Sequence, residues 1–116
     1  MGRLTTHVLD TARGVPAAGV DVVLYRVDAE LRELARARTN DDGRLDQPIL
    51  QDEDFRAGVY QLVFQAGDYF RACGAAGDEP LFVDEVVLRF GISDAAEHYH
   101  VPLLVSPFAY STYRGS

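Results

Sequence analysis

The chain has 116 residues, of which 47% are hydrophobic and 25% charged, and its formal net charge is -7. This length supports one domain with a modest core, and the composition is that of an ordinary globular protein. Nucleic-acid binding through phosphate contacts is disfavoured, because 18 acidic residues outnumber 11 basic ones. An anionic membrane surface is disfavoured for the same reason, and no apolar run approaches the roughly 20 residues that span a bilayer.

Cysteine content and the chain ends bear on the cellular compartment. Cys73 is the only cysteine, so an internal disulfide is excluded, which fits a reducing compartment. We expect Cys73 to be a buried small residue rather than a nucleophile. The first residues contain no apolar signal-peptide core, and the final Arg-Gly-Ser is not a peroxisomal address. We therefore expect a cytoplasmic protein.

Short segments that alternate between apolar and polar residues dominate the chain, which is typical of half-buried strands. Residues 31–39 are ambiguous, since their Leu, Arg, Glu and Ala content favours a helix, whereas residues 34–39 alternate. Strands on both sides favour a hairpin here, and Asn-Asp-Asp-Gly at 40–43 is a strong turn signal. The predicted strands cover residues 3–10, 20–27, 31–39, 44–50, 59–66, 85–92, 98–105 and 109–113, and the strand at 44–50 is expected to be interrupted at Pro48.

One short helix is predicted at residues 68–73, with Asp68 as its N-cap and Gly74 as its stop. Pro102 cannot donate a ladder hydrogen bond, so it must lie at an edge, a bulge or an unpaired position. The polar end of the chain, residues 113–116, is expected to be docked, because chain ends fray unless they are tied down. About eight short strands and one helix predict an all-β sandwich.

Three histidines are available for proton transfer near neutral pH: His7, His98 and His100. His98 and His100 fall on the same face of a strand, about 6–7 Å apart by strand rise. Such a pair could bind zinc, but no cysteine or third histidine has matching spacing, so a site without metal is favoured. Taken alone, His7 is best interpreted as a surface or hydrogen-bonded histidine on an edge strand.

Three segments together resemble a known family. Residues 113–116 read Tyr-Arg-Gly-Ser, residues 4–14 read Leu-Thr-Thr-His-Val-Leu-Asp-Thr-Ala-Arg-Gly, and residues 42–44 read Asp-Gly-Arg. They resemble the signatures of the 5-hydroxyisourate hydrolases, the transthyretin-related enzymes of urate breakdown. The signature in the tail separates these enzymes from transthyretin, the hormone carrier on the same fold. The resemblance implies one transthyretin-like hydrolase domain over residues 1–116, with two four-stranded sheets and one short helix.

The resemblance also implies a set of site residues. It places the active-site histidines at His7 and His100 and the site arginine at Arg44, and it adds Tyr113 and Ser116 from the tail. Taken alone, an arginine beside a turn is usually solvated. A guanidinium nevertheless offers a planar fork of donors to the carbonyl oxygens and ring nitrogens of a urate-like substrate. His98 is not carried over as catalytic and is interpreted as structural.

The implied activity is hydrolysis of the cyclic amide of 5-hydroxyisourate, which gives 2-oxo-4-hydroxy-4-carboxy-5-ureidoimidazoline. No cofactor or metal is implied, and the family implies a homotetramer with sites at the interface between dimers. A neutral His100 or His7 would activate water as general base, and Arg44 would stabilise the oxyanion. Attack by Ser116 itself is less favoured, although its side chain or carboxylate is expected in the site. A carrier of small ligands without chemistry and a structural module are the alternatives.

Overall fold

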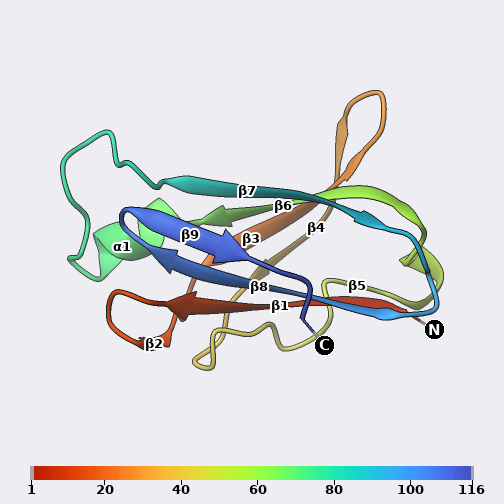
Figure 1. Cartoon of the computed structure of the whole chain (residues 1–116), viewed down its shortest axis with the longest axis horizontal. Helices are drawn as coiled ribbons and strands as arrows, with labels where there is room; N and C mark the ends of the chain where they lie inside the picture. The colour runs from red at the N-terminus through yellow and green to blue at the C-terminus, as the bar shows by residue number, and fades with distance from the viewer. Residues whose placement is uncertain (1, 116) are drawn as a thin grey trace.

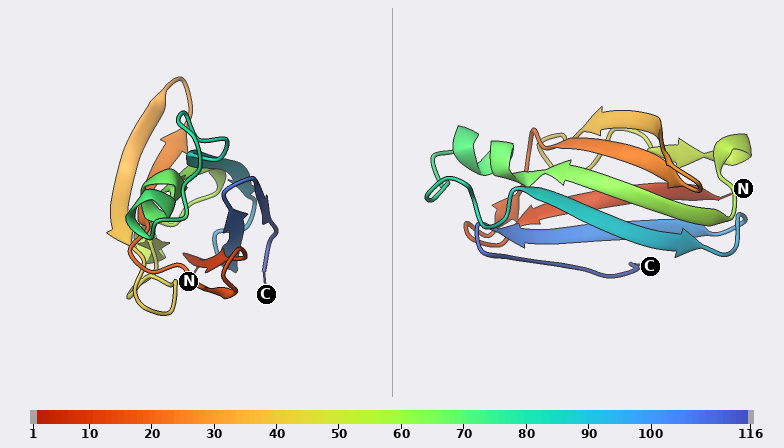
Figure 2. Two further views of the ribbon diagram at one scale, coloured as in Figure 1. Left: turned by 90° about the vertical axis from the view of Figure 1, so that its left-hand side faces the viewer. Right: turned by 90° about the horizontal axis from the view of Figure 1, so that it is seen from above.

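The computed structural model describes residues 2–115 and places two β-sheets face to face (Figures 1 and 2). One sheet has the order β4-β3-β6-β7, and every neighbouring pair in it is antiparallel. Its strands are β3 (Asp21–Val27), β4 (Leu31–Arg38), β6 (Gly58–Gln65) and β7 (Glu85–Ile92). The ambiguous segment at 31–39 is therefore a strand, as predicted.

The second sheet joins the two ends of the chain. Its order is β2-β1-β8-β9, and β5 also pairs with β1. Strands β1 and β8 run parallel, whereas β9 is antiparallel to β8. The strands are β1 (Arg3–Asp10), β2 (Val15–Pro16), β5 (Leu50–Gln51), β8 (His98–Ser106) and β9 (Ala109–Thr112). The all-β sandwich is confirmed, and the two-residue β5 extends this sheet beyond the four strands expected.

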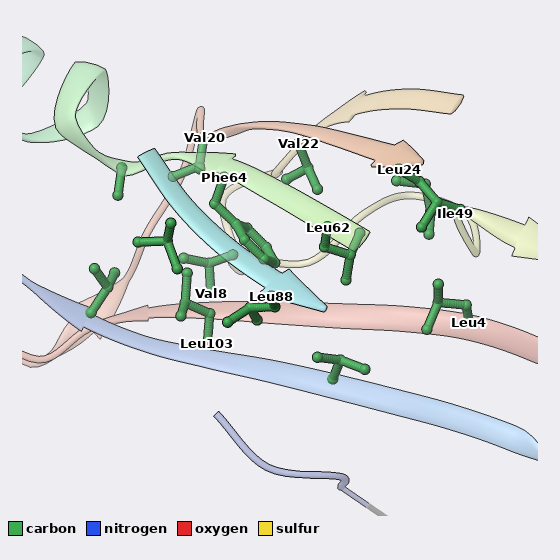
Figure 3. Packing of buried hydrophobic residues seen from close by; sticks show 14 of the residues in the cluster. Leu4, Val8, Val20, Val22, Leu24, Ile49, Leu62, Phe64, Leu88 and Leu103 are labelled. Atoms are coloured by element: carbon green, nitrogen blue, oxygen red, sulfur yellow. The ribbon is translucent and has the colours of Figure 1, made fainter. Parts of the chain in front are cut away.

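The core lies between the two sheets (Figure 3). Strand β1 alternates strictly between buried and outward residues, and β8 does so except at Pro102, which is buried as well. Removing this apolar surface from water supplies the main favourable term of folding, about 25 cal/mol per Å². The fully buried side chains include Leu4, Val8, Val22, Leu24, Leu62, Phe64 and Leu103. The outward residues of β1 and β8 are therefore held on a rigid backbone.

Residues 44–50 do not form the predicted strand. Arg44 makes only an isolated bridge with His7, and regular pairing resumes at β5. Pro48 interrupts the segment, because it has no N–H to offer a ladder. The turn before it is confirmed: Gly43 has φ of +75°, and a Cβ there would lie 2.3 Å from the carbonyl oxygen of Val8. Glycine thus allows the turn to press against β1.

The only helix of four or more residues in the described part of the chain is α1 (Ala66–Ala72). It begins two residues before the predicted start, and Asp68 is not its N-cap. Gln65 occupies that position without a side-chain bond, and the Gly67 N–H donates to the carbonyl of Asp84 at 2.9 Å instead. Gly74, at φ of +76°, follows the helix as predicted. Within residues 2–115 no helix has the length and apolar character needed to cross a membrane.

A buried carboxylate ties the end of β1 to α1. Asp10 accepts the hydroxyl of Tyr69 at 2.8 Å and Nε of Arg13 at 3.0 Å, and Arg13 also donates to the Tyr69 oxygen at 2.6 Å. Burial raises the pKa of Asp10, but the hydrogen bonds from Tyr69 and Arg13 outweigh burial and hold the pKa below its ordinary value. The ionised carboxylate therefore contributes to stability.

Candidate active site

The outward face of the β1–β8 pair gathers most of the predicted site. Parallel pairing sets Arg3 beside His98 and Thr5 beside His100, and His7 falls opposite Pro102. Pro102 precedes the β8–β9 ladder, which begins at Leu103, so its missing N–H is tolerated as expected. Residues from the two ends of the sequence thus become neighbours on one surface.

A hollow of about 280 Å³ opens on this face. Its polar lining combines two cations, two imidazoles, two threonines, one carboxylate and one amide, namely Arg3, Arg44, His98, His100, Thr5, Thr6, Asp46 and Gln47. Loop residues 45–48 form the opposite wall. The hollow can receive a small polar molecule and offers it both hydrogen-bond donors and a proton acceptor.

Thr5 links the two histidines of β8. Its Oγ1 lies 2.6 Å from Nε2 of His98 and 2.8 Å from Nδ1 of His100. The ring centroids of His98 and His100 are 6.1 Å apart, in agreement with the spacing expected on one strand face. A hydroxyl has only one proton to donate, so when both imidazoles are neutral at least one ring must donate its N–H to Oγ1, and at most one ring can accept from it. The tautomers of the two histidines are therefore coupled through Thr5.

Both histidines of β8 are held in the neutral form. Burial is the main cause that lowers the pKa of His100, and the nearby charges of Arg44, His98 and His7 lower it further. The pKa of His98 is lowered by burial and by Arg3. A neutral imidazole near pH 7 has a lone pair on one nitrogen and can accept a proton. Because Nδ1 of His100 is engaged by Thr5, Nε2 is the atom available to a bound molecule.

His7 lies beside the hollow and is joined to it through the bridge with Arg44. Its Nε2 lies 2.8 Å from the carbonyl oxygen of Asp42. A carbonyl can only accept, so Nε2 of His7 carries the proton and Nδ1 of the neutral ring has the lone pair. His7 is thus fixed in one tautomer by the same turn that presents Arg44.

The tail is docked along β8 as far as the structure describes it. Gly115 donates its backbone N–H to the carbonyl of His100 at 2.7 Å. Arg114 donates to Glu97 at 2.8 Å, and its guanidinium carbon lies 3.8 Å from the centroid of the Tyr99 ring. Ser116, the last of the predicted site residues, lies outside the described residues. The tail backbone therefore reaches the strand of the two histidines.

Tyr113 is not brought into the same hollow within one chain. Its side chain is 59% exposed and lines a separate hollow beside Arg114 and residues 87–91 of β7. The structure thus brings His7, Arg44 and His100 together, whereas Tyr113 points to the edge between the sheets. Its expected contact with substrate remains a prediction.

The sequence analysis did not assign Arg3 and Thr5 of β1 to the site, nor Thr6 and residues 45–48. Arg3 and Thr5 matter most, because they lie beside His98 and His100. Both alternate with the buried Leu4 and Thr6, so they share the outward face with His7. This alternation was visible in the sequence. What was not visible is the parallel register with β8, which alone sets Thr5 between two histidines.

The structure also bears on the zinc site and on the cysteine that the sequence analysis considered. In the span 2–115 no group of three or more His, Cys, Asp or Glu side chains is arranged to hold a metal ion. Cys73, which we expected to be buried, is an exposed free thiol after α1. It does not line the hollow that contains His100.

Comparison with known proteins identifies the family to which this chain belongs. A sequence model of the HIUase/Transthyretin family matches residues 4–115. A 5-hydroxyisourate hydrolase of Pseudomonas aeruginosa is 66% identical, covering 100% of this chain and 93% of the relative.

Solved structures agree with this match. A Klebsiella pneumoniae 5-hydroxyisourate hydrolase has a TM-score of 0.83 at 34% identity, over 100% of this chain and 94% of that chain. An (S)-allantoin synthase has a TM-score of 0.94 at 44% identity over 99% of this chain; the present chain spans only 44% of that longer protein. This protein, with its two β-sheets and its polar hollow, therefore belongs to the HIUase/transthyretin family.

Proposed function

We propose that this protein is a 5-hydroxyisourate hydrolase that opens the cyclic amide of its substrate to give 2-oxo-4-hydroxy-4-carboxy-5-ureidoimidazoline in urate breakdown. Whole-length similarity to proteins of that name supports the substrate. The observation that carries the chemistry is the neutral His100 beside Arg44 in one polar hollow. We also propose that residues 1–116 act as a single hydrolase domain in the cytoplasm.

His100 is the proposed general base. In the productive tautomer its Nδ1–H donates to Thr5, and the Thr5 hydroxyl donates to His98, which leaves the lone pair on Nε2. Nε2 then takes a proton from a water molecule, and the resulting hydroxide attacks the amide carbonyl carbon. The lowered pKa of His100 keeps this lone pair available at neutral pH.

Arg44 stabilises the oxyanion that forms when hydroxide adds to the carbonyl. The exposed Arg44 guanidinium offers charge and two parallel N–H donors, and donors placed where negative charge develops lower the barrier. The tetrahedral intermediate then collapses as the C–N bond breaks. The imidazolium of His100 returns its proton to the leaving nitrogen, and the carboxylic acid that remains releases its proton to solvent and becomes a carboxylate.

Three further residues have proposed substrate contacts. Nδ1 of His7 can accept an N–H of the substrate, because Asp42 fixes its tautomer. Tyr113 and Ser116 are proposed to contribute polar groups to the site of the assembled protein. No metal and no organic cofactor take part in these steps.

A homotetramer is the proposed working form. The hollow lies on the outward face of a sheet, so a second subunit is needed to close it and exclude water. Exposed aromatic residues near the chain end, among them Phe108 and Tyr110, provide apolar surface for such contacts. Dilution below the dissociation constant is expected to abolish activity while the β-sheet circular dichroism persists, and a fully active monomer would contradict this assembly.

The decisive experiment generates 5-hydroxyisourate in situ with a urate oxidase and follows its ultraviolet decay. The wild-type chain should accelerate decay far beyond the spontaneous rate, and the matched variant His100→Asn should lose most of that acceleration. Exhaustive chelation should leave the rate unchanged. A protein that binds the compound without accelerating its decay would be a carrier of the transthyretin kind instead.

A further inference from the structure

The arginines of this acidic chain are distributed unevenly. All 11 basic residues are arginines. Within residues 2–115, five of them lie within 4 Å of a carboxylate: Arg13, Arg36, Arg38, Arg71 and Arg114. The other six have no such ion pair there, although the chain offers 18 acidic residues. Two of the six, Arg3 and Arg44, line the candidate active site.

Three more of these six line a second hollow, beside the β3–β4 hairpin. This hollow has a volume of about 550 Å³ and contains Arg26, Arg32 and Arg56, with a single acidic residue, Asp54. Its walls come from the β3–β4 hairpin on one side and from β5 and the 3₁₀ turn Asp52–Asp54 on the other. A local excess of positive charge is thus concentrated on a protein of net charge -7.

The pairing of β3 with β4 makes this concentration of positive charge destabilising. Arg26 and Arg32 are direct cross-strand partners in β3 and β4, so their side chains leave the sheet on the same face. Like charges directly opposite each other destabilise a sheet. An anion held between two such guanidinium groups would remove this repulsion and form charge-assisted hydrogen bonds with both.

The Arg26 guanidinium is already positioned by the protein. It donates to the hydroxyl of Tyr60 at 2.8 Å and to the carbonyl of Ala57 at 3.3 Å, and its carbon lies 5.2 Å from the Tyr60 ring centroid. Gly58, at φ of +149°, leaves room for it, because a Cβ there would lie 2.5 Å from Nη2 of Arg26. A preorganised arginine loses little freedom when it binds an oxyanion.

We propose that this hollow binds a small organic anion with carboxylate groups, at a site separate from the hydrolase centre. Arginine forks fit carboxylates in a bidentate geometry. Leu34, Leu50 and Tyr60 supply apolar wall for an organic body, which a bare inorganic ion would not use. The volume lies in the range of small-molecule sites. The ligand therefore combines negative oxygens for Arg26, Arg32 and Arg56 with a carbon skeleton.

Citrate is the probe, titrated by calorimetry at constant ionic strength. The titration uses the Arg44→Ala protein, so that anion binding at the hydrolase centre does not contribute. We expect one site per chain with a dissociation constant on the order of 1 mM, the value for about 13 heavy atoms at ordinary ligand efficiency. Inorganic phosphate should bind more weakly. Absence of saturable citrate binding, or phosphate binding as tight as citrate, would overturn the proposal.

Variants locate the site. Adding Arg32→Ala should weaken citrate about tenfold, the usual effect of losing a charged hydrogen bond. Asp54→Asn should strengthen binding, because it removes the one acidic residue. Arg38→Ala is the matched control on the same strand, since Arg38 already pairs with Asp21 at 2.8 Å, and it should change nothing. Equal losses in Arg32→Ala and Arg38→Ala would show only a general charge effect and refute the site. In the otherwise wild-type chain, Arg32→Ala should retain full hydrolase activity.

Discussion

The hydroxyl of Thr5 lies 2.8 Å from Nδ1 of His100, and it reaches His98 at 2.6 Å through the same oxygen. This contact joins the first strand of the chain to the strand of the histidines. It holds the His100 ring through Nδ1, so we infer that Thr5 acts as a positioning residue for the base.

Replacing Thr5 by valine tests this role. Thr5→Val retains the shape but removes the hydroxyl, so His100 loses a partner that holds its ring and tautomer. We expect kcat to fall about tenfold or more, the equivalent of one hydrogen bond to a group that becomes charged. Thr5→Ser restores the hydroxyl and should recover most of the rate. If serine and valine behave alike, the hydroxyl has no role in turnover.

The dependence of activity on pH follows from the lowered pKa of His100. Burial, Arg44, His98 and His7 all disfavour the imidazolium. The base therefore stays neutral as the pH falls to about 6.5, the ordinary value, and protonates only below it. We expect kcat/KM to be flat from pH 8 to about 6.5 and to decline in more acidic solution. An acid limb centred above pH 6.5 would contradict the assignment.

A variant of Arg44 provides an independent check on that limb. Arg44→Gln removes a positive charge that lowers the pKa of His100, so the limb should move towards higher pH while kcat falls. A loss of rate without any movement of the limb would mean that Arg44 acts on the substrate alone.

Substitution of each histidine separates their roles. His100→Asn should lower kcat by roughly 10² or more, as expected for a lost general base. His7→Asn should lower it to a similar extent, because the proposed substrate contact and the hydrogen bond to the Asp42 carbonyl are both lost. His98→Asn should cost less, since His98 is not the proposed base and acts on His100 through Thr5. Equal losses at His98 and His100 would overturn the choice of base.

The fold was largely predictable because alternation is a local property. Leu4 and Val8 alternate with Thr5 and His7, so the sequence alone showed which side of β1 is buried. In β8 the alternation of Tyr99, His100 and Val101 likewise separates the buried side from the outward side. The strand proposed at 44–50 failed because alternation there does not supply a pairing partner, and Pro48 removes a donor.

The site was only partly predictable. The resemblance to a family located His7, Arg44 and His100, which the structure brings to one face. The bridging role of Thr5 depends on the parallel register between strands about 90 residues apart, which no local pattern encodes. The orientation of Tyr113 depends on where β9 ends and the tail leaves it, which is likewise a tertiary property.

Stability should depend on the buried Asp10 network. Tyr69→Phe removes a donor to Asp10 and an acceptor for Arg13, and both partners remain in place. We expect the free energy of unfolding at pH 7 to fall by about 1–3 kcal/mol. Tyr25→Phe, at a half-buried side chain of β3, is the control and should stay within about 0.5 kcal/mol.

Acid should remove the contribution of the same network. The pKa of Asp10 is lowered in the folded state, so its stabilising effect is present above the ordinary value of 3.8 and is lost as the pH falls through the lowered value. Urea unfolding at pH 7 and at acidic pH should therefore show a smaller difference between wild type and Tyr69→Phe in acid. A difference that is independent of pH would mean that Asp10 is not the partner concerned.

The last prediction concerns Gly115, where the tail meets the histidine strand. Its N–H reaches the His100 carbonyl at 2.7 Å, and a Cβ added at Gly115 would lie 2.7 Å from Cδ2 of the His100 ring. A methyl group there must displace either the ring or the tail, and a displacement of the base by about 1 Å can cost 10²-fold in rate. We expect Gly115→Ala to lower kcat steeply while the thermal midpoint changes little, because the tail buries little apolar surface. Gly91→Ala is the matched control, since a Cβ at Gly91 in β7 meets nothing within 4 Å. Measuring turnover and thermal midpoint for both variants separates a local effect on His100 from a general loss of stability. Unchanged turnover in Gly115→Ala would show that the tail can move aside without disturbing the base.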